Sequence, residues 1–315
     1  CALPICLGLA QWLVDPTNPL MSRVTVNRFW QQYFGVGIVK TVEDFGSQGD
    51  APSNQELLDW LATEFVRTGW DVKAFQKTIV MSATYQQSSK TTPEMVQRDP
   101  DNKLFSHGPR FRLTAPMIRD QALSLAGLLV NQVGGPSVMP YQPAGLWADL
   151  SAAEYVQDHG DKLYRRSLYT FWKRTIPPPT MASFDASARE SCIVRQTTTN
   201  TPLQALDLMN DVQFLEAARV LAQKVMTEGG TKPEDRVRWA FRRITGRVPN
   251  QKELQMLMDS FNYQLDAFQS KPAAALKYVS QGEYPRDQKL NVSQLAAYTT
   301  LTSFIMNLDE TSTKE

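Results

Sequence analysis

Hydrophobic residues recur at helical spacing along the first part of the chain. Val26, Phe29, Trp30 and Tyr33 follow the i, i+3, i+4, i+7 pattern of one helical face, and Gly35 is suited to end that helix. Similar stripes predict a helix capped at Ser53 with Glu56, a third capped at Asp71, and a fourth from Thr114 to Gly134–Gly135. The pattern therefore predicts a helical segment over residues 7–134.

The pattern changes between residues 135 and 200. Six prolines fall between Pro136 and Pro179, and this density is incompatible with long helices. Within this stretch, residues 165–174 alternate in a way that predicts a short strand or an extended segment. We expect a Pro-rich irregular middle, 135–200, that carries short β segments.

Helical signals return after residue 200. Thr201 is suited to cap a helix that has Pro202 at its first position, and Gln204 completes a capping box there. Asn250 and Glu253 form the same kind of pair at a later helix start. A last helix is expected near 292–307. The predicted fold is mainly α, a single helical domain over 7–310 that is helical at 7–134 and 201–310, with a frayed tail at 311–315.

Composition narrows the function classes. Lys and Arg number 33 against 32 Asp and Glu, and this balance gives no electrostatic footprint for nucleic acid. The apolar start is too short to span a bilayer, so we predict no transmembrane segment in this chain. Residues 1–6 resemble a translated sequencing-adapter end, and we interpret them as an assembly artefact.

The sequence contains few residues of the types that bind metals or cofactors. The chain holds two histidines and three cysteines, without recognisable zinc spacing and without a haem-attachment motif, so we expect no cofactor and no metal within it. The exception is the glycine-rich acidic loop near residue 46, where Asp44, Ser47 and Asp50 are a weak calcium candidate. A solvated turn is the simpler interpretation of that loop.

A polar segment supplies the weak catalytic candidates. Cys192 lies between Arg189 and Arg195, and cationic neighbours of this kind are typical of a nucleophilic thiol, although a small buried hydrophobe is the commoner role for a lone cysteine. Asp185 and Glu190 could be paired carboxylates, or could simply form ion pairs with arginines such as Arg195. The catalytic residues stay unknown, with Asp185, Glu190, Cys192 and Arg195 as candidates.

Aromatic and basic residues crowd the irregular middle. Such side chains can stack on sugar rings or anchor a protein partner, and they can equally fasten an irregular segment to the helical core. The candidate binding residues are Tyr141, Trp147, Tyr164, Arg165, Arg166, Tyr169, Trp172 and Asn200.

Twelve short segments of the chain follow one family pattern in order: Asn18–Leu20, Arg23–Trp30, Phe34–Gly37, Asp44–Gly46, Glu56–Ala62, Ser82–Tyr85, Arg119–Asp120, Gly134–Val138, Tyr164–Tyr169, Phe184–Asp185, Thr199–Leu206 and Asn307–Glu310. Together they resemble the planctomycete-specific C-terminal domain of unknown function found in large planctomycete proteins that contain cytochrome c. The chain departs from the family pattern at Ser187 and Ala188, where the family has Pro-Asp.

The resemblance implies an extracytoplasmic, periplasmic multidomain protein with a haem-c domain upstream of this chain, in a context of polysaccharide utilisation. It carries over no catalytic residue. We therefore expect a non-catalytic module that binds a glycan or the haem-c domain of the same protein. The alternatives are an enzyme acting on a glycan with its site near Asp185–Arg195, and a rigid structural spacer.

Overall fold

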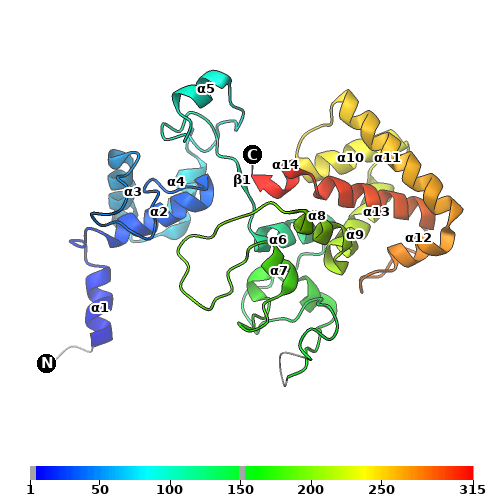
Figure 1. Ribbon diagram of the computed structural model, residues 1–315, viewed down its shortest axis with the longest axis horizontal. Helices are drawn as coiled ribbons and strands as arrows, with labels where there is room; N and C mark the ends of the chain where they lie inside the picture. The colour runs from blue at the N-terminus through cyan, green and yellow to red at the C-terminus, as the bar shows by residue number, and fades with distance from the viewer. Residues whose placement is uncertain (1–4, 149–152, 315) are drawn as a thin grey trace. The chain divides into compact units, whose positions relative to one another are not determined.

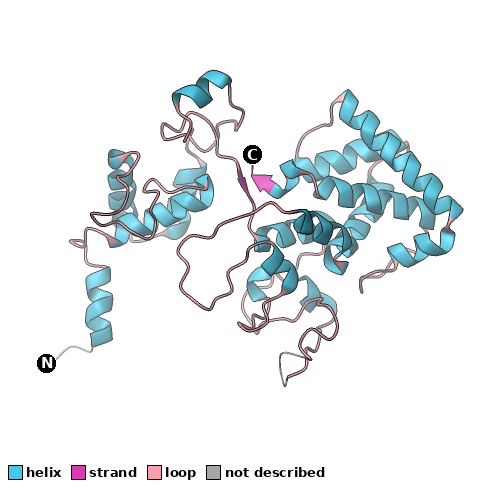
Figure 2. Ribbon diagram, in the orientation of Figure 1, coloured by secondary structure: helices cyan, strands magenta, loops and turns pink. Residues whose placement is uncertain are grey.

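Helices dominate the computed structural model, which describes residues 5–148 and 153–314 (Figure 2). The only strands in this described part are β1 (Phe111–Arg112) and β2 (Thr313–Lys314), which pair as a two-stranded sheet. The prediction of a mainly α fold is confirmed. The chain forms two compact units, residues 1–111 with 314–315 and residues 112–313.

The first unit is built on three helices, and Trp30 and Phe34 stack at its centre with ring centroids 4.0 Å apart. Two further helices, α1 and α5, have no buried residue. The helices are α1 (Ile5–Leu13), α2 (Met21–Phe34), α3 (Gln55–Arg67), α4 (Val72–Val80) and α5 (Pro93–Arg98). Their apolar core comprises Val26, Trp30, Phe34, Ile38, Val39, Leu58, Leu61, Ala62, Phe65, Phe75 and Ile79.

Local sequence signals account for the ends of these helices. Gly35 ends α2 in the left-handed conformation, with φ of 75°, and Asp71 caps α4 by accepting from Ala74 N, as predicted. The predicted cap of α3 is wrong by one residue. Asn54, rather than Ser53, accepts the hydrogen bond from Leu57 N at 2.9 Å, and asparagine is an equally good cap.

The second unit is a helical bundle around α13, which packs against α9, α11 and α12 (Figure 1). Buried residues occur all round α13, as expected for a helix enclosed by others. Its helices are α6 (Ala115–Ala126), α7 (Pro179–Ser183), α8 (Pro202–Asn210), α9 (Val212–Glu228), α10 (Pro233–Thr245), α11 (Gln251–Ser270), α12 (Pro272–Val279), α13 (Val292–Met306) and α14 (Asp309–Ser312), with 3-10 turns η1 (Gly160–Tyr164) and η2 (Ser167–Tyr169).

The two capping boxes predicted for the second unit are confirmed, at Thr201 for α8 and at Asn250 for α11. The predicted end of α6 is wrong. The helix stops at Ala126, and Gly127 takes the left-handed conformation with φ of 74°. Gly127 N donates to the carbonyls of Leu123 and Ser124 and so closes the helix seven residues before Gly134.

The irregular middle has less β structure than its alternation predicts. Residues 167–169 turn as η2, and the bridges Val130–Arg165 and Val138–Thr170 are isolated. A continuous strand is prevented because Asp120 accepts hydrogen bonds from both Ser167 N, at 2.8 Å, and Ser167 Oγ, at 2.7 Å. The middle is an extended and turning segment that packs on helices.

Residues 311–314, which fall in the predicted tail, form the end of α14 and strand β2. Thr311 and Ser312 are buried in α14, and the Thr311 hydroxyl donates to the carbonyl of Ile305 at 2.9 Å. At the other end, the artefact interpretation concerns residues 1–4, which lie outside the described residues, and Ile5 and Cys6, which begin α1. No helix in the described ranges combines the length and apolarity needed to cross a membrane.

Candidate functional site

A fully buried arginine ties the irregular middle to the bundle. Arg119 of α6 donates through NH1 to the carbonyl of Arg165 and through NH2 to the carbonyl of Leu163, both at 2.7 Å. Its Nε donates to the side chain of Gln213 on α9. Burial lowers the pKa of this guanidinium to about 10, so it stays charged at neutral pH. Arg119 therefore fixes the backbone just before η2.

A second buried polar group lies on α9. Glu216 accepts from Tyr164 Oη at 3.2 Å, from Tyr141 Oη at 3.3 Å and from Tyr284 N at 2.6 Å. Burial raises the pKa of Glu216, and burial together with the nearby carboxylate raises that of Tyr141 to about 12. Arg219, one turn along, lies 3.6 Å from Glu216 and balances its charge.

Four of the predicted binding residues hold the middle in place. Tyr141 and Tyr164 contact Glu216, while Arg165 donates to the carbonyls of Gln132 and Gly134 and lies 3.8 Å from the ring centre of Tyr169. Arg165 is only 4% exposed. The structure uses these four side chains as fastenings, which was the simpler of the two interpretations open from the sequence.

Three others lie nearer solvent. Arg166 lies 3.8 Å from Asp120 with 55% of its side chain exposed, and Asn200 is exposed. Trp172 donates from Nε1 to the carbonyl of Ala188 at 3.2 Å, and Arg189 covers its ring at 4.5 Å. None of these three residues lines the pocket that contains Trp147.

The eighth candidate, Trp147, lines a hollow of about 520 Å³. Its walls are residues 142–148, Ala153, Glu154, Tyr155 and Gln157. Tyr155 packs edge-on against Trp147 with ring centroids 5.2 Å apart, and Lys173 Nζ lies 4.2 Å from the centre of the Trp147 ring. We call this cavity the Trp147 hollow.

Two hydrogen-bond donors of the hollow have no partner. Trp147 is 6% exposed, and its Nε1 is buried without a hydrogen-bond partner. The same is true of the Nε2 atom of Gln142. An unsatisfied buried donor costs about 1–3 kcal/mol, so such groups are rare and call for an explanation. Both donors belong to residues that line the hollow.

Asp185, the first catalytic candidate, closes a loop. Its Oδ2 accepts from Thr199 N at 2.6 Å and from Thr199 Oγ1 at 2.7 Å, and its carbonyl accepts from the side chain of Gln196. The fully buried Gln204 donates to the carbonyl of Ser183 at 2.9 Å, next to this turn. The Asp185 carboxylate therefore holds the two ends of the loop 186–199 together.

The other catalytic candidates lie along that loop and are exposed: Glu190, Cys192 and Arg195. The interpretation of Cys192 as a buried hydrophobe is wrong, because the thiol is free and exposed. Neither histidine is its partner, since His107 bonds Gly108 O and His159 bonds Glu283. None of these candidates lines the Trp147 hollow.

The calcium candidate forms a self-contained turn in the first unit. Asp44 accepts from Gly46 N at 2.7 Å, and Thr41 Oγ1 accepts from Asp50 N at 2.9 Å. Ser47 lies between them in the same loop. Within the described ranges, no three His, Cys, Asp or Glu side chains gather in a way that could hold a metal ion.

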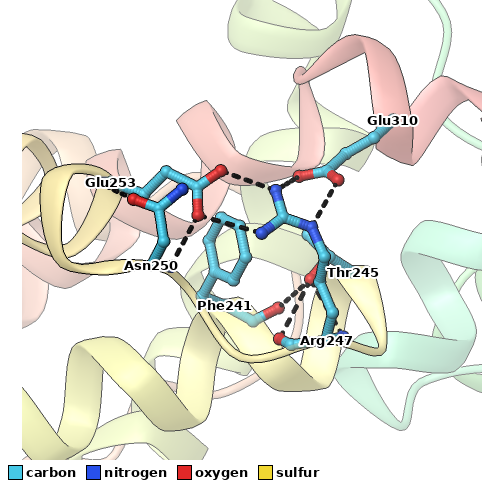
Figure 3. Close-up of polar contacts among 6 residues, drawn as sticks. All are labelled: Phe241, Thr245, Arg247, Asn250, Glu253 and Glu310. Carbon is cyan, nitrogen blue, oxygen red and sulfur yellow. Dashed lines mark hydrogen bonds and ion pairs between the residues drawn. The ribbon is translucent and has the colours of Figure 1, made fainter.

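The densest exposed charge network closes the end of the second unit (Figure 3). Arg247 binds Glu253, at the start of α11, and Glu310 of α14 with two hydrogen bonds each. Its guanidinium also lies 4.8 Å from the ring centre of Phe241. Every carboxylate oxygen in this network is engaged, so it is a structural fastening of the chain end.

Sequence reasoning missed Gln142 and Glu283. Nothing in the local pattern marks Gln142, because its burial depends on the fold of its own irregular loop. Glu283 lies 124 residues from its partner His159, and no local signal can reveal such a contact. Arg119 was noted only as part of a resembling segment.

The structure defines a mainly helical protein whose irregular middle carries a hollow beside two buried, unpartnered donors. The chain belongs to the PSD1 family, described as "Protein of unknown function (DUF1553)", whose profile matches residues 6–261. No curated protein and no solved structure matches the chain.

Proposed function

We propose that this chain is a non-catalytic binding module that takes a carbohydrate into the Trp147 hollow. The observation that carries the proposal is the pair of buried, unpartnered donors, Gln142 Nε2 and Trp147 Nε1, on two residues that line a cavity of about 520 Å³. A volume of this size is in the range of small-molecule sites.

The chemistry of the walls favours a sugar. Hydroxyl, ring and acetamido oxygens supply the acceptors that the two donors lack. The apolar faces of a pyranose ring need aromatic or aliphatic neighbours, and Tyr155, Leu146 and Pro143 supply them. The candidate catalytic side chains lie elsewhere, which favours binding over turnover.

The test is calorimetric titration of the whole chain with chitohexaose, cellohexaose and an alginate hexasaccharide. Trp147→Phe keeps the ring but removes the N–H donor, and Gln142→Met keeps the length but removes the amide. Each variant is expected to weaken binding about fivefold, because one hydrogen bond contributes about 1 kcal/mol.

Trp172→Phe is the matched control, since it makes the same change at a tryptophan whose Nε1 already bonds Ala188 O. It should bind as the wild type does. The proposal fails if no oligosaccharide of the panel binds, or if Trp147→Phe and Trp172→Phe bind equally well.

The cellular setting is part of the same proposal. We place the chain outside the cytoplasm, beside a haem-c domain of the same protein as a second partner. This setting is supported by the resemblance of twelve segments of the chain to the planctomycete domain found in proteins that contain cytochrome c. Cell fractionation with an antibody to the chain tests the compartment, and a pull-down with the separately expressed haem-c domain tests the partner.

A further inference from the structure

The loop that carries the Trp147 hollow begins and ends at neighbouring residues. Asp158 N donates to Met139 O, and Met139 N donates to Asp158 Oδ2, both at 2.8 Å. The two ends of the segment between Met139 and Asp158 therefore lie side by side. Residues 139–141 and 158–160 are the two stems of this loop.

One residue from a distant segment contacts both stems. Glu283, in the connection between α12 and α13, accepts from Gly160 N at 2.9 Å and bonds His159 Nδ1 at 2.8 Å. Its own backbone N donates to Tyr141 Oη at 2.7 Å. The carboxylate thus holds one stem while the backbone holds the other.

Glu283 is itself held rigidly. The next residue, Tyr284, donates its N–H to Glu216 at 2.6 Å and accepts from Arg219 NH2 at 2.6 Å. On the other side, Gly282 has φ of +82°, and a Cβ there would lie 2.3 Å from Glu216 Oε1. The buried pair on α9 therefore fixes the position from which Glu283 reaches the stems.

We propose that Glu283 is a positioning residue that staples the two stems and so sets the shape of the Trp147 hollow. Because ligand binding and stem closure share one loop, each stabilises the other by the same factor. A ligand in the hollow tightens the contact of Glu283 with Gly160, and loss of that contact weakens the ligand. The nature of the ligand rests on the proposed function, whereas the staple does not.

The staple is tested without ligand, on the whole chain labelled with 5-fluorotryptophan. The fluorine resonance of Trp147 is the one absent from Trp147→Phe, and hydrogen exchange follows the amide of Gly160. Glu283→Ala should shift or broaden that resonance and speed Gly160 exchange at least about fivefold, as expected for local opening.

Glu283→Gln is the rescue variant, because its amide oxygen still accepts from Gly160 N, and it should restore most of both signals. The matched control is Asp287→Ala, which removes a carboxylate of the same connection that bonds only Lys289 N among the described contacts. It should leave the Trp147 resonance unchanged. The proposal is overturned if Glu283→Ala leaves both the resonance and Gly160 exchange as in the wild type.

A second arm separates the two proposals. If chitohexaose binds the wild type, Glu283→Ala should weaken its binding about fivefold while Asp287→Ala should not. If no oligosaccharide binds, the carbohydrate proposal fails, and the resonance and exchange data still decide the staple.

Discussion

Arg247 binds Glu253 through two parallel hydrogen bonds, from NH2 to Oε1 at 2.7 Å and from NH1 to Oε2 at 2.9 Å. Glu253 also accepts from Asn250 N at 2.7 Å, so its carboxylate serves the capping box of α11 as well as the ion pair. Together the hydrogen bonds from Arg247 and Asn250 lower the pKa of Glu253 to about 2.

This lowered pKa predicts an acid-dependent loss of stability. The ordinary pKa of 4.5 applies in the unfolded chain, so the stabilisation is complete above about pH 4.5 and is lost as the pH falls towards 2. Both side chains are partly exposed, so we expect less than about 1 kcal/mol. Thermal unfolding of the wild type and Glu253→Gln should therefore converge at low pH, and Glu234→Gln, an exposed carboxylate of α10, is the control.

Loss of Arg119 should lower the free energy of unfolding far more than loss of the Glu253 carboxylate. Arg119→Met leaves the carbonyls of Leu163 and Arg165 buried without their donor, and we expect about 3 kcal/mol of lost stability. Urea denaturation should show a lower midpoint with an unchanged slope. Arg166→Met, with its exposed guanidinium, should change the midpoint little, and equal effects of the two would contradict the anchoring role.

Removal of the Asp185 carboxylate should release its loop. Asp185→Ala deletes both hydrogen bonds to Thr199, so residues 186–199 should open more often. Limited trypsin digestion should then cleave after the exposed Arg189 and Arg195 at least about threefold faster than in the wild type. Glu190→Ala, in the same loop, should leave the cleavage rate unchanged.

Two glycines distinguish steric crowding from backbone strain. Gly282 and Gly246 have nearly equal φ, +82° and +80°, but only at Gly282 would a Cβ meet another atom, Glu216 Oε1 at 2.3 Å. Gly246→Ala should cost about 1 kcal/mol, which is the conformational term alone. Gly282→Ala should cost clearly more, as measured by urea denaturation, and equal losses would mean that the connection shifts freely.

Much of the helical framework follows from short-range sequence signals. Thr201 and Asn250 act within four residues of their own helix starts, so their caps could be read directly. The end of α6 could not be predicted in this way, because Gly127 and Gly134 are equally plausible helix ends when only the local pattern is considered.

The candidate site was predicted less well. Trp147 was named from aromatic density, but Tyr164 and Arg165 share that density and serve as fastenings. What separates them is contact with Glu216 and with the 132–136 backbone, and such long-range contacts leave no periodic trace in the sequence. The same holds for Gln142, whose unpartnered amide depends on burial alone.

The stems of the hollow meet at Met139 and Asp158, which bond one another at 2.8 Å. Tyr141, in the first stem, contacts Glu216 of α9 and is bound to the helical core. Substitutions in residues 142–148 and 153–157 should therefore change the hollow while leaving the bundle intact. We therefore expect sequence and length differences among family members to concentrate between Met139 and Asp158, where they cost the helical core least.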